Sequence, residues 1–502
     1  MTDRDREGAI VTAQTLTSES LNSVLTAAAA AKPVLAAQSP QQRYGQLTAV
    51  ADGLDAAAEE LVPVAMAESH LPEARLRGEL RRTTMQLRLF AEEAREGRFL
   101  DVRIDVPDPD FGSGPRPDIR RMRRPIGVVL NFAASNFPFA FSVAGGDTAS
   151  ALGAGCPVIV KAHEGHPELS ARTAEIVHSA LTGAGAPAGT FDIIYGREIG
   201  VAALSDDRVD AATFTGSVRG GLALADIAAR RARPIPFYGE LGSINPVVVT
   251  PAAIAARGAD IAQGFVDSFT LGSGQFCTKP GLVFLPAGHG LDDVLATAAA
   301  GKPAGELLTE AITAGFAARL ADLVGSLGGR LLAESRLIDG NPSPGLLVID
   351  YPTFEQHRNN AMTEVFGPFA IIVEYRDASE IASAIEQLEG SLTLTIQAEE
   401  SDSALVGSLL SSIEQKAGRI LVNDWPTGVS VTPAQHHGGP YPSTTNPLHT
   451  AVGTAAIERF LRPVTYQNFY GPWLPEPLRD DNPWNVPQNR SDAGQSQHWG
   501  RR

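Results

Sequence analysis

From Gly127 onward the chain alternates short apolar runs with longer segments of helical composition, and this alternation limits the possible folds more than any other feature. The runs GVVLNFA, PVIVKAH, FDIIYG and VDAATFTGS favour strands, and the segments between them favour helices. Strands that alternate with helices of this length are typical of βαβ units, which assemble into a parallel, doubly wound sheet. We therefore predict an α/β fold whose first wound sheet spans residues 127–240.

The length of the chain indicates more than one lobe. A single hydrophobic core stops growing at roughly 250–300 residues, and this chain has 502. We predict a helical layer in residues 1–108, a linker or edge hairpin in 109–126, the wound sheet in 127–240, a second α/β lobe in 241–440, and a C-terminal return with a polar arm or loose tail in 441–502. The end of the last part is rich in Pro and Asn and too poor in apolar residues to fold alone.

Charge and composition restrict the kind of partner. The net charge of -16 argues against nucleic-acid binding, which needs a basic surface. No apolar run is long enough to span a bilayer, and the first residues, MTDRDREGAI, lack the features of a secretory signal. The two cysteines can form neither a disulfide framework nor a Cys-based metal site. We therefore expect a cytoplasmic protein with a small-molecule partner and no nucleic-acid, membrane or metal partner.

Cys277 is the first candidate for chemistry because it lies in the segment LGSGQFCTKPG. Glycines at positions 272 and 274 predict a tight loop in which a ligand can reach the thiol. A free thiol has a pKa of about 8.5 and is only slightly ionised at neutral pH, so a nearby base or positive dipole must assist it. The alternative is a small buried residue, the usual role of a single cysteine, which also fits Cys156 in GAGCPVIV.

Two further polar residues lie where apolar strands are predicted to end. Glu240 in YGELGSINP is bracketed by glycines between two apolar runs, where a carboxylate can serve as a base or simply face water. Asn136 in NFAASNFPF follows the first predicted strand, near the edge where wound sheets bind ligands. Its amide can donate to an oxyanion, or it can be an ordinary turn residue.

A dinucleotide site is indicated only weakly by local pattern. No GxGxxG follows any predicted strand, so the usual fingerprint is absent. Lys161 ends the strand-like run PVIVK, and Gly216 and Ser217 precede a predicted helix whose first N–H groups suit a pyrophosphate. The alternatives are a solvated lysine at a strand end and a serine that caps the helix.

Taken together, these segments resemble the NAD(P)-dependent aldehyde dehydrogenase superfamily from about Leu21 to Phe469. The similarity is carried, in chain order, by NFAASNFPFAFSVAGGDTASALGAGCPVIVKAHEGH, ATFTGSVRGG, GELGSINP, GQFCTKPG, TEVFGPF and HHGGPYPSTTNPLHTAVGTAAIERFLRPVTYQNF. The resemblance implies an aldehyde dehydrogenase-like fold and an enzyme that oxidises an aldehyde to a carboxylate with NAD or NADP. Within the superfamily, AFSVAGGDTASALGAGCPVIVKAH, GQFCTKPG and HGGPYPSTTN are most similar to 2-oxoglutarate semialdehyde (2,5-dioxopentanoate) dehydrogenases and their fatty-aldehyde relatives, and we favour the first substrate.

The same resemblance implies roles for individual residues. Cys277 would be the nucleophile, Glu240 the general base, and Asn136 the oxyanion donor beside the Cys277 backbone N–H. The residues implied on the cofactor are Lys161, Glu164, Gly216, Ser217, Glu364 and Phe366.

The choice between NAD and NADP stays open at this point. The carboxylate of Glu164 can accept the adenosine ribose 2′-OH and would repel a 2′-phosphate, which favours NAD. Arg197 could offset this by pairing with a phosphate, or it could be a solvated helix residue.

The resemblance also assigns functions to the predicted parts. Residues 1–108 and 127–240 would form the cofactor-binding domain and residues 241–440 the catalytic domain. Residues 109–126, together with the C-terminal region in 441–502, would form the contacts of a homodimer or homotetramer. Two other hypotheses are an acylating dehydrogenase that passes the acyl group to coenzyme A, against which Glu240 argues, and a non-catalytic protein that has kept the fold.

Overall fold

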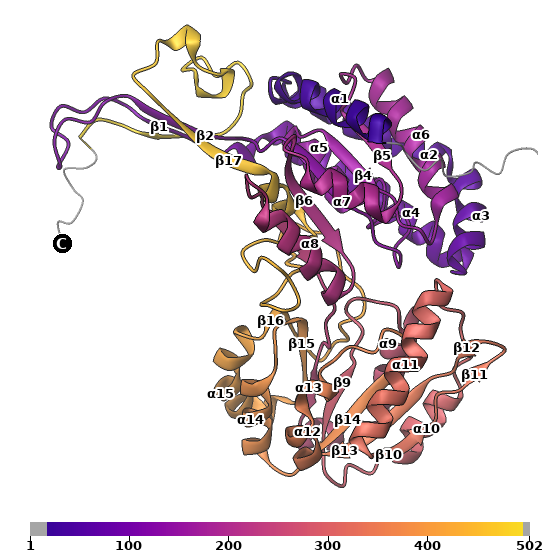
Figure 1. Cartoon of the computed structure of the whole chain (residues 1–502). Helices are drawn as coiled ribbons and strands as arrows, with labels where there is room; N and C mark the ends of the chain where they lie inside the picture. Colours follow the sequence, from indigo (N-terminus) through magenta and orange to yellow (C-terminus); the bar gives the residue numbers. More distant parts are fainter. Residues whose placement is uncertain (1–17, 495–502) are drawn as a thin grey trace, which may run out of the picture.

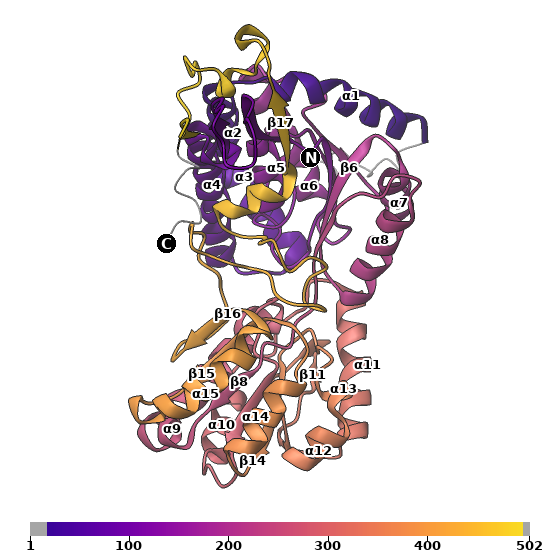
Figure 2. The same cartoon turned by 90° about the vertical axis from the view of Figure 1, so that its left-hand side faces the viewer.

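The computed structural model describes residues 18–494 and contains two α/β lobes and a projecting arm (Figure 1). The first lobe holds the N-terminal helices and a five-stranded sheet, the second lobe a seven-stranded sheet, and the arm a four-stranded sheet. Figure 2 shows the two lobes stacked one above the other. The predicted α/β class with a wound parallel sheet is confirmed. The start of the first predicted part and the end of the last, residues 1–17 and 495–502, lie outside the described residues.

Four helices open the first lobe: α1 (Ser18–Ala36), α2 (Pro40–Ala56), α3 (Ala58–Ser69) and α4 (Glu73–Glu96). Local sequence sets some of their ends. Ser39 and Gln42 form a reciprocal capping box at the start of α2, and Gly97, with a φ of 65°, ends α4 in the left-handed conformation that glycine adopts readily. None of the helices within residues 18–494 is both long and apolar enough to cross a membrane.

The five-stranded sheet is parallel, with strand order β5-β4-β3-β6-β7. Its strands are β3 (Val128–Phe132), β4 (Val158–Lys161), β5 (Phe191–Ile194), β6 (Val209–Thr215) and β7 (Phe237–Glu240), and its helices are α5 (Gly146–Ala154), α6 (Pro167–Gly183), α7 (Arg197–Ser205) and α8 (Val218–Arg230). Alternate residues of β3 face opposite cores: Val129 packs with α2, α4 and α6, whereas Val128 and Leu130 pack with α1 and α7. The strand order reverses at β3 and β6, where wound sheets bind ligands.

The seven-stranded sheet of the second lobe has the order β10-β13-β14-β9-β8-β15-β16, and only β10 runs antiparallel to its neighbour. Its strands are β8 (Val247–Val249), β9 (Leu282–Pro286), β10 (Arg330–Ala333), β13 (Gly345–Asp350), β14 (Phe369–Tyr375), β15 (Ser391–Gln397) and β16 (Ala417–Val422), and a short hairpin adds β11 (Leu337–Ile338) and β12 (Asn341–Pro342). One face packs on α9 (Pro251–Thr270) and α10 (Asp292–Ala300). The other packs on α11 (Glu310–Leu327), α12 (Tyr351–Gln356), α13 (Arg358–Ala361), α14 (Ala378–Gln387) and α15 (Ser403–Glu414).

The arm is a four-stranded sheet that extends away from both lobes (Figure 1). Its order is β17 (Leu461–Gln467), β2 (Ile119–Pro125), β1 (Val102–Asp105) and β18 (Gln488–Ser491). The predicted boundary at residue 109 is too late, because β1 belongs to this sheet and forms a hairpin with β2. The C-terminal residues are an arm up to 494, since β18 pairs with β1.

Candidate active site

Four of the predicted site residues lie at the carboxyl edge of the five-stranded sheet. Asn136 follows β3, Lys161 is the last residue of β4, Ser217 follows β6, and Glu240 is the last residue of β7. The second lobe supplies Cys277, in the loop between the 3-10 turn Leu271–Gly274 and β9. Parallel strands place their carboxyl ends at one edge, which explains why positions so distant in sequence come together.

The loop that carries Cys277 is held in a conformation that requires glycine. Gly272 and Gly274 have φ values of 57° and 70°, and a Cβ on Gly274 would lie 2.2 Å from the carbonyl oxygen of Gly367. The side-chain amide of Asn245 donates to the Cys277 carbonyl at 2.8 Å. These contacts fix the backbone of the nucleophile candidate, and its side chain remains partly exposed.

Cys277 meets two other groups, Glu240 and His437. The Sγ of Cys277 lies 3.5 Å from Nε2 of His437, and the same nitrogen lies 2.9 Å from Oε1 of Glu240. Their ligand-type atoms all lie within 4.8 Å of one another, so these residue types could also hold a soft divalent ion. Because both short contacts use Nε2, the tautomer of His437 decides which one carries a hydrogen bond.

His437 was missed from the sequence. The His437 side chain is buried, with the residue 1% exposed. The backbone N–H of His437 donates to Oγ1 of Thr450 at 2.8 Å. The available signal was the Gly-rich segment HHGGPYP, in which a histidine precedes two glycines. Nothing in that local pattern points to Glu240, which lies 197 residues earlier.

The surroundings of Cys277 disfavour its thiolate. Burial and the negative charge of Glu240 raise the pKa of the thiol well above its ordinary value, and the positive charge of Arg82 opposes this shift. The free protein therefore holds Cys277 mainly as the neutral thiol at neutral pH. Burial likewise raises the pKa of Cys156, to about 11.

Alkylation of Cys277 by iodoacetamide should therefore be slow at pH 7 and should still accelerate as the pH rises past 9. A raised pKa leaves less thiolate at neutral pH than in free cysteine, and that fraction grows with pH. Glu240→Gln removes the negative charge and should speed the reaction at pH 7. Mass spectrometry of the modified peptide measures the rate, and a plateau below pH 8 would contradict the expected shift.

Asn136 is buried beside the nucleophile loop. The side-chain Nδ2 of Asn136 donates to the backbone carbonyl oxygen of Gln275 at 3.0 Å. The backbone carbonyl oxygen of Asn136 accepts from Nη2 of Arg75 at 2.8 Å. A side-chain amide carries two N–H groups, so this contact uses one of them.

The residues predicted to contact the cofactor form two groups. In the first lobe Lys161 Nζ lies 2.9 Å from Oε1 of Glu164, and this contact lowers the pKa of the Glu164 carboxyl. Ser217, which follows Gly216, caps α8 by accepting a hydrogen bond of 3.2 Å from the N–H of Gly220. Ser217 thus has its alternative role of a helix cap. Lys161 is 9% exposed and paired with Glu164, so it is not a solvated lysine at a strand end.

The second group lies in the loop between α13 and β14. Glu364 has a buried Oε1 without a hydrogen-bond partner among residues 18–494, and burial raises its pKa while the charge of Lys279 opposes the rise. A Cβ on Gly242 would come within 2.5 Å of the carboxylate. Phe366 lies two residues further on and is half-buried. A buried carboxylate oxygen without a partner suits a sugar hydroxyl donor.

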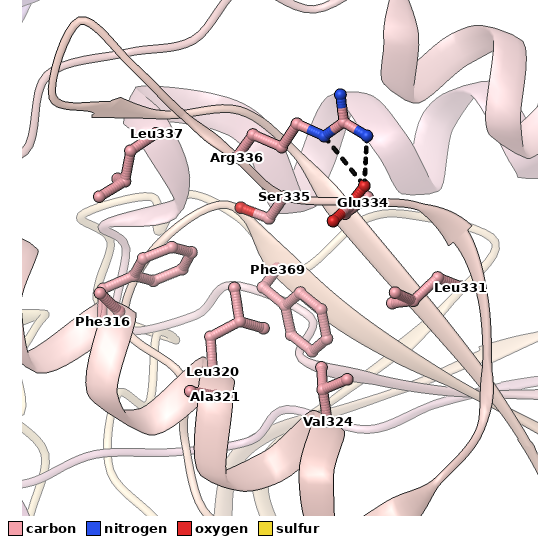
Figure 3. Close-up of a pocket in the computed structure, with 11 residues that line it drawn as sticks. Phe316, Leu320, Ala321, Val324, Leu331, Glu334, Ser335, Arg336, Leu337 and Phe369 are labelled. Atoms are coloured by element: carbon pink, nitrogen blue, oxygen red, sulfur yellow. Dashed lines mark hydrogen bonds and ion pairs between the residues drawn. The ribbon is translucent and has the colours of Figure 1, made fainter.

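Cavities lie both at this site and away from it. A cavity of about 290 Å³ lies between α11 and the β10–β11 segment, lined by Phe316, Leu320, Val324, Leu337 and Phe369 among others, and none of the predicted site residues lines it (Figure 3). A hollow of about 20 Å³ is lined by Glu240 and His437 together with the polar residues Thr444 and Asn446. That volume is enough for one water molecule.

The fold and the site define a class of protein: a two-lobed α/β protein in which a cysteine of one lobe meets a carboxylate at the carboxyl edge of the wound sheet in the other. Residues 2–302 match the aldehyde dehydrogenase family. The chain belongs to the aldehyde dehydrogenase family and is an oxidoreductase that acts on aldehydes, whose members use NAD(P)⁺.

Two curated relatives cover most of the chain. Alpha-ketoglutaric semialdehyde dehydrogenase 2 from Azospirillum brasilense is 49% identical over 90% of this chain and 88% of its own length. Alpha-ketoglutaric semialdehyde dehydrogenase from Acinetobacter baylyi is 41% identical over 89% of this chain and 86% of its own length. The crystal structure of aldehyde dehydrogenase 21 from Physcomitrella patens, in complex with succinate, superposes with a TM-score of 0.76 at 23% identity over 90% of this chain and 91% of that chain, which supports the fold.

Proposed function

We propose that this protein oxidises 2-oxoglutarate semialdehyde to 2-oxoglutarate with NAD⁺ or NADP⁺. The substrate follows from the two relatives at 49% and 41% identity, which are similar to this chain over most of its length. The chemistry rests on one observation, the convergence of Cys277 from the second lobe with Glu240 from the first.

Cys277 and Asn136 act in the first half of the reaction. The Cys277 sulfur adds to the aldehyde carbon, and the thiol proton leaves to solvent, to which the Cys277 side chain is partly exposed. The negative charge that develops on the substrate oxygen is held by the second N–H of Asn136 and by the backbone N–H of Cys277. A donor of this kind contributes about 3 kcal/mol in other enzymes.

The residues around the cofactor site fit a dinucleotide. The first N–H groups of α8, a helix of 13 residues, suit a pyrophosphate. Lys161 and the unpartnered Oε1 of Glu364 can bind ribose hydroxyls, and Phe366 follows Glu364 by two residues. When bound, the nicotinamide dinucleotide accepts the hydride that leaves the substrate carbon.

Glu240 acts in the second half, on the thioester that remains on Cys277. It takes a proton from water, and the polar hollow beside it has room for that water. The contact of 2.9 Å with Nε2 of His437 fixes the carboxylate. His437 is therefore a positioning residue in this mechanism. The bond between sulfur and the acyl carbon breaks, the carboxylate product leaves, and the thiol regains its proton.

Glu164→Gln should shift the cofactor preference towards NADP⁺. The substitution removes a negative charge near the position expected for the 2′-phosphate, and the exposed Arg197 is close enough to influence Glu164 electrostatically. We expect the ratio of kcat/KM for NADP⁺ over NAD⁺ to rise about tenfold. Glu175→Gln, at an exposed position of α6, is the matched control. An unchanged ratio would remove Glu164 from the cofactor site.

Two other functions lead to different results. An acylating dehydrogenase would need coenzyme A for turnover, whereas Glu240 beside the thiol favours hydrolysis. An enzyme for long-chain aldehydes would prefer uncharged aliphatic substrates.

We also propose that the arm mediates a homodimer or homotetramer, with the first lobe as cofactor-binding domain and the second as catalytic domain. Exposed aromatic residues near the arm support this: the side chains of Tyr470 and Trp473 are 65% and 74% exposed. Analytical ultracentrifugation of the purified protein tests the assembly.

The proposed activity is tested with three aldehydes, each with NAD⁺ and with NADP⁺. The aldehydes are 2-oxoglutarate semialdehyde, propanal and a long-chain aldehyde, and the reduced cofactor is followed by absorbance. The highest kcat/KM on 2-oxoglutarate semialdehyde without coenzyme A supports the proposal. A higher value for the long-chain aldehyde would reassign the substrate.

A further inference from the structure

Two arginines of α4 turn inward, although most of the charged residues on this helix face solvent. Arg75 and Arg82 lie seven positions apart in the sequence and therefore on the same face of the helix. Nη1 of Arg75 and both Nε and Nη2 of Arg82 are buried and have no hydrogen-bond partner among residues 18–494. Buried guanidinium donors without partners are costly, so this arrangement calls for a ligand.

These guanidinium groups lie against the aromatic wall of the active site. Arg75 Cζ is 4.7 Å from the ring centroid of Phe276, the residue before Cys277. Arg82 Cζ is 5.5 Å from the ring centroid of Phe141. The Phe141 ring is in turn 6.4 Å from the ring of His437, which contacts the nucleophile. The Phe141 ring thus lies between the guanidinium of Arg82 and His437.

The charge of Glu79 acts on Arg82 electrostatically, but no group of the described residues occupies the Nε and Nη2 donors of Arg82. Glu79 lies between the two arginines on α4, but its Oε1 accepts from the backbone N–H groups of Phe139 and Ala140. No ion pair joins Glu79 to either arginine within the described residues. Arg419, which like Arg82 interacts with Cys277 electrostatically, donates from both terminal nitrogens to the carbonyl oxygens of Pro426 and Gly428, and only its Nε lacks a partner among the described residues.

We propose that Arg82, with Arg75 behind it, binds the carboxylate at the far end of an aldehyde acid and so selects such substrates over uncharged aldehydes. This inference rests on the proposed function and assigns the group that recognises the 2-oxo acid end. A guanidinium donates two parallel hydrogen bonds to a carboxylate. In 2-oxoglutarate semialdehyde four carbon–carbon bonds, roughly 5 Å, separate the aldehyde carbon from the carboxylate carbon.

The subsite explains how an aromatic wall can admit a charged substrate. Phe137, Phe141 and Phe276 would favour an apolar chain. An uncharged aldehyde, however, leaves the donors of Arg82 without partners, whereas a carboxylate satisfies them. A site built to hydrogen-bond a substrate group rejects an analogue that lacks the group.

The test uses a matched substrate pair, 5-oxopentanoate and its methyl ester, in which a methyl group removes the charge at the far end. For Arg82→Met we expect the ratio of kcat/KM, acid over ester, to fall about 100-fold. Arg82→Lys keeps the charge, so the ratio of kcat/KM should fall less in this variant than in Arg82→Met. Arg81→Met, at an exposed neighbouring position of α4, is the matched control and should leave the ratio unchanged.

A second readout does not depend on turnover. Glutarate should slow alkylation of Cys277 in the wild type and in Arg81→Met but much less in Arg82→Met. Circular dichroism of each variant establishes that it is folded. An equal loss on both substrates would overturn the inference and assign Arg82 to the reactivity of Cys277, as would undiminished protection by glutarate in Arg82→Met.

The two proposals fail in different ways. If the wild type oxidises the methyl ester better than 5-oxopentanoate and 2-oxoglutarate semialdehyde, the proposed function is wrong. If the wild type prefers the acids and Arg82→Met retains the same preference, the function stands and the arginine subsite is wrong.

Discussion

We expect Cys277→Ala to abolish aldehyde oxidation. The loss in kcat should be roughly 10⁵-fold, as in other enzymes that lose their nucleophile. Without the sulfur no covalent adduct forms, and hydride has no tetrahedral carbon to leave. The cofactor residues Lys161 and Glu364 are unchanged in this variant, so binding of the dinucleotide should persist. Absorbance of the reduced cofactor measures the first effect, and isothermal titration calorimetry with NAD⁺ and NADP⁺ measures the second.

Cys156→Ala is the matched control for the loss of a thiol. Cys156 is fully buried in the core of the first lobe, and its Sγ lies 3.6 Å from the carbonyl oxygen of Phe460. Its replacement should lower the free energy of unfolding slightly and leave kcat within about twofold. Turnover that survives in Cys277→Ala and is lost in Cys156→Ala would reverse the assignment of the nucleophile.

The second large effect is expected for Glu240→Gln. The amide cannot take a proton from water, so hydrolysis of the thioester should slow by roughly 10²–10⁴-fold. Formation of the thioester uses Cys277 and Asn136 and should be affected less. Rapid mixing should therefore show a burst of about one reduced cofactor per active site, followed by a slow steady state.

Mass spectrometry of the quenched protein should find the acyl group on Cys277 after the burst. His437→Asn should show the same burst with a smaller loss in the steady rate, because the base remains and only its orientation is weakened. A steady rate lowered without any burst would mean that Glu240 acts before the thioester forms, which would contradict the proposed division of roles.

Much of the fold followed from local pattern. Strands β3 and β4 coincide with apolar runs because they are buried on both faces, whereas β5, β6 and β7 are partly exposed and also carry polar residues. The same reasoning placed Glu240 and Asn136 near strand ends, where the structure has them. The residue roles themselves remain predictions for the variants to test.

What the sequence did not reveal depends on contacts between distant segments. The role of His437 can be recognised only from its contact with Glu240. The role of Arg82 can be recognised only from its contact with Phe141, which lies between β3 and α5. In α4, Arg82 stands among exposed arginines and carboxylates, so the local pattern resembles a solvated face. Strand β1 has only four residues, too few to show a period, and its partner β18 lies far along the chain.

The pairing of β1 with β18 also has a consequence for biosynthesis. Residues 102–105 leave the ribosome long before residues 488–491, so one edge of the arm remains open while the lobes are being made. An open strand edge is a template for pairing with another chain. Nascent chains on neighbouring ribosomes are thus exposed to mispairing at this edge, and slower elongation would lengthen the interval in which chaperones must shield it.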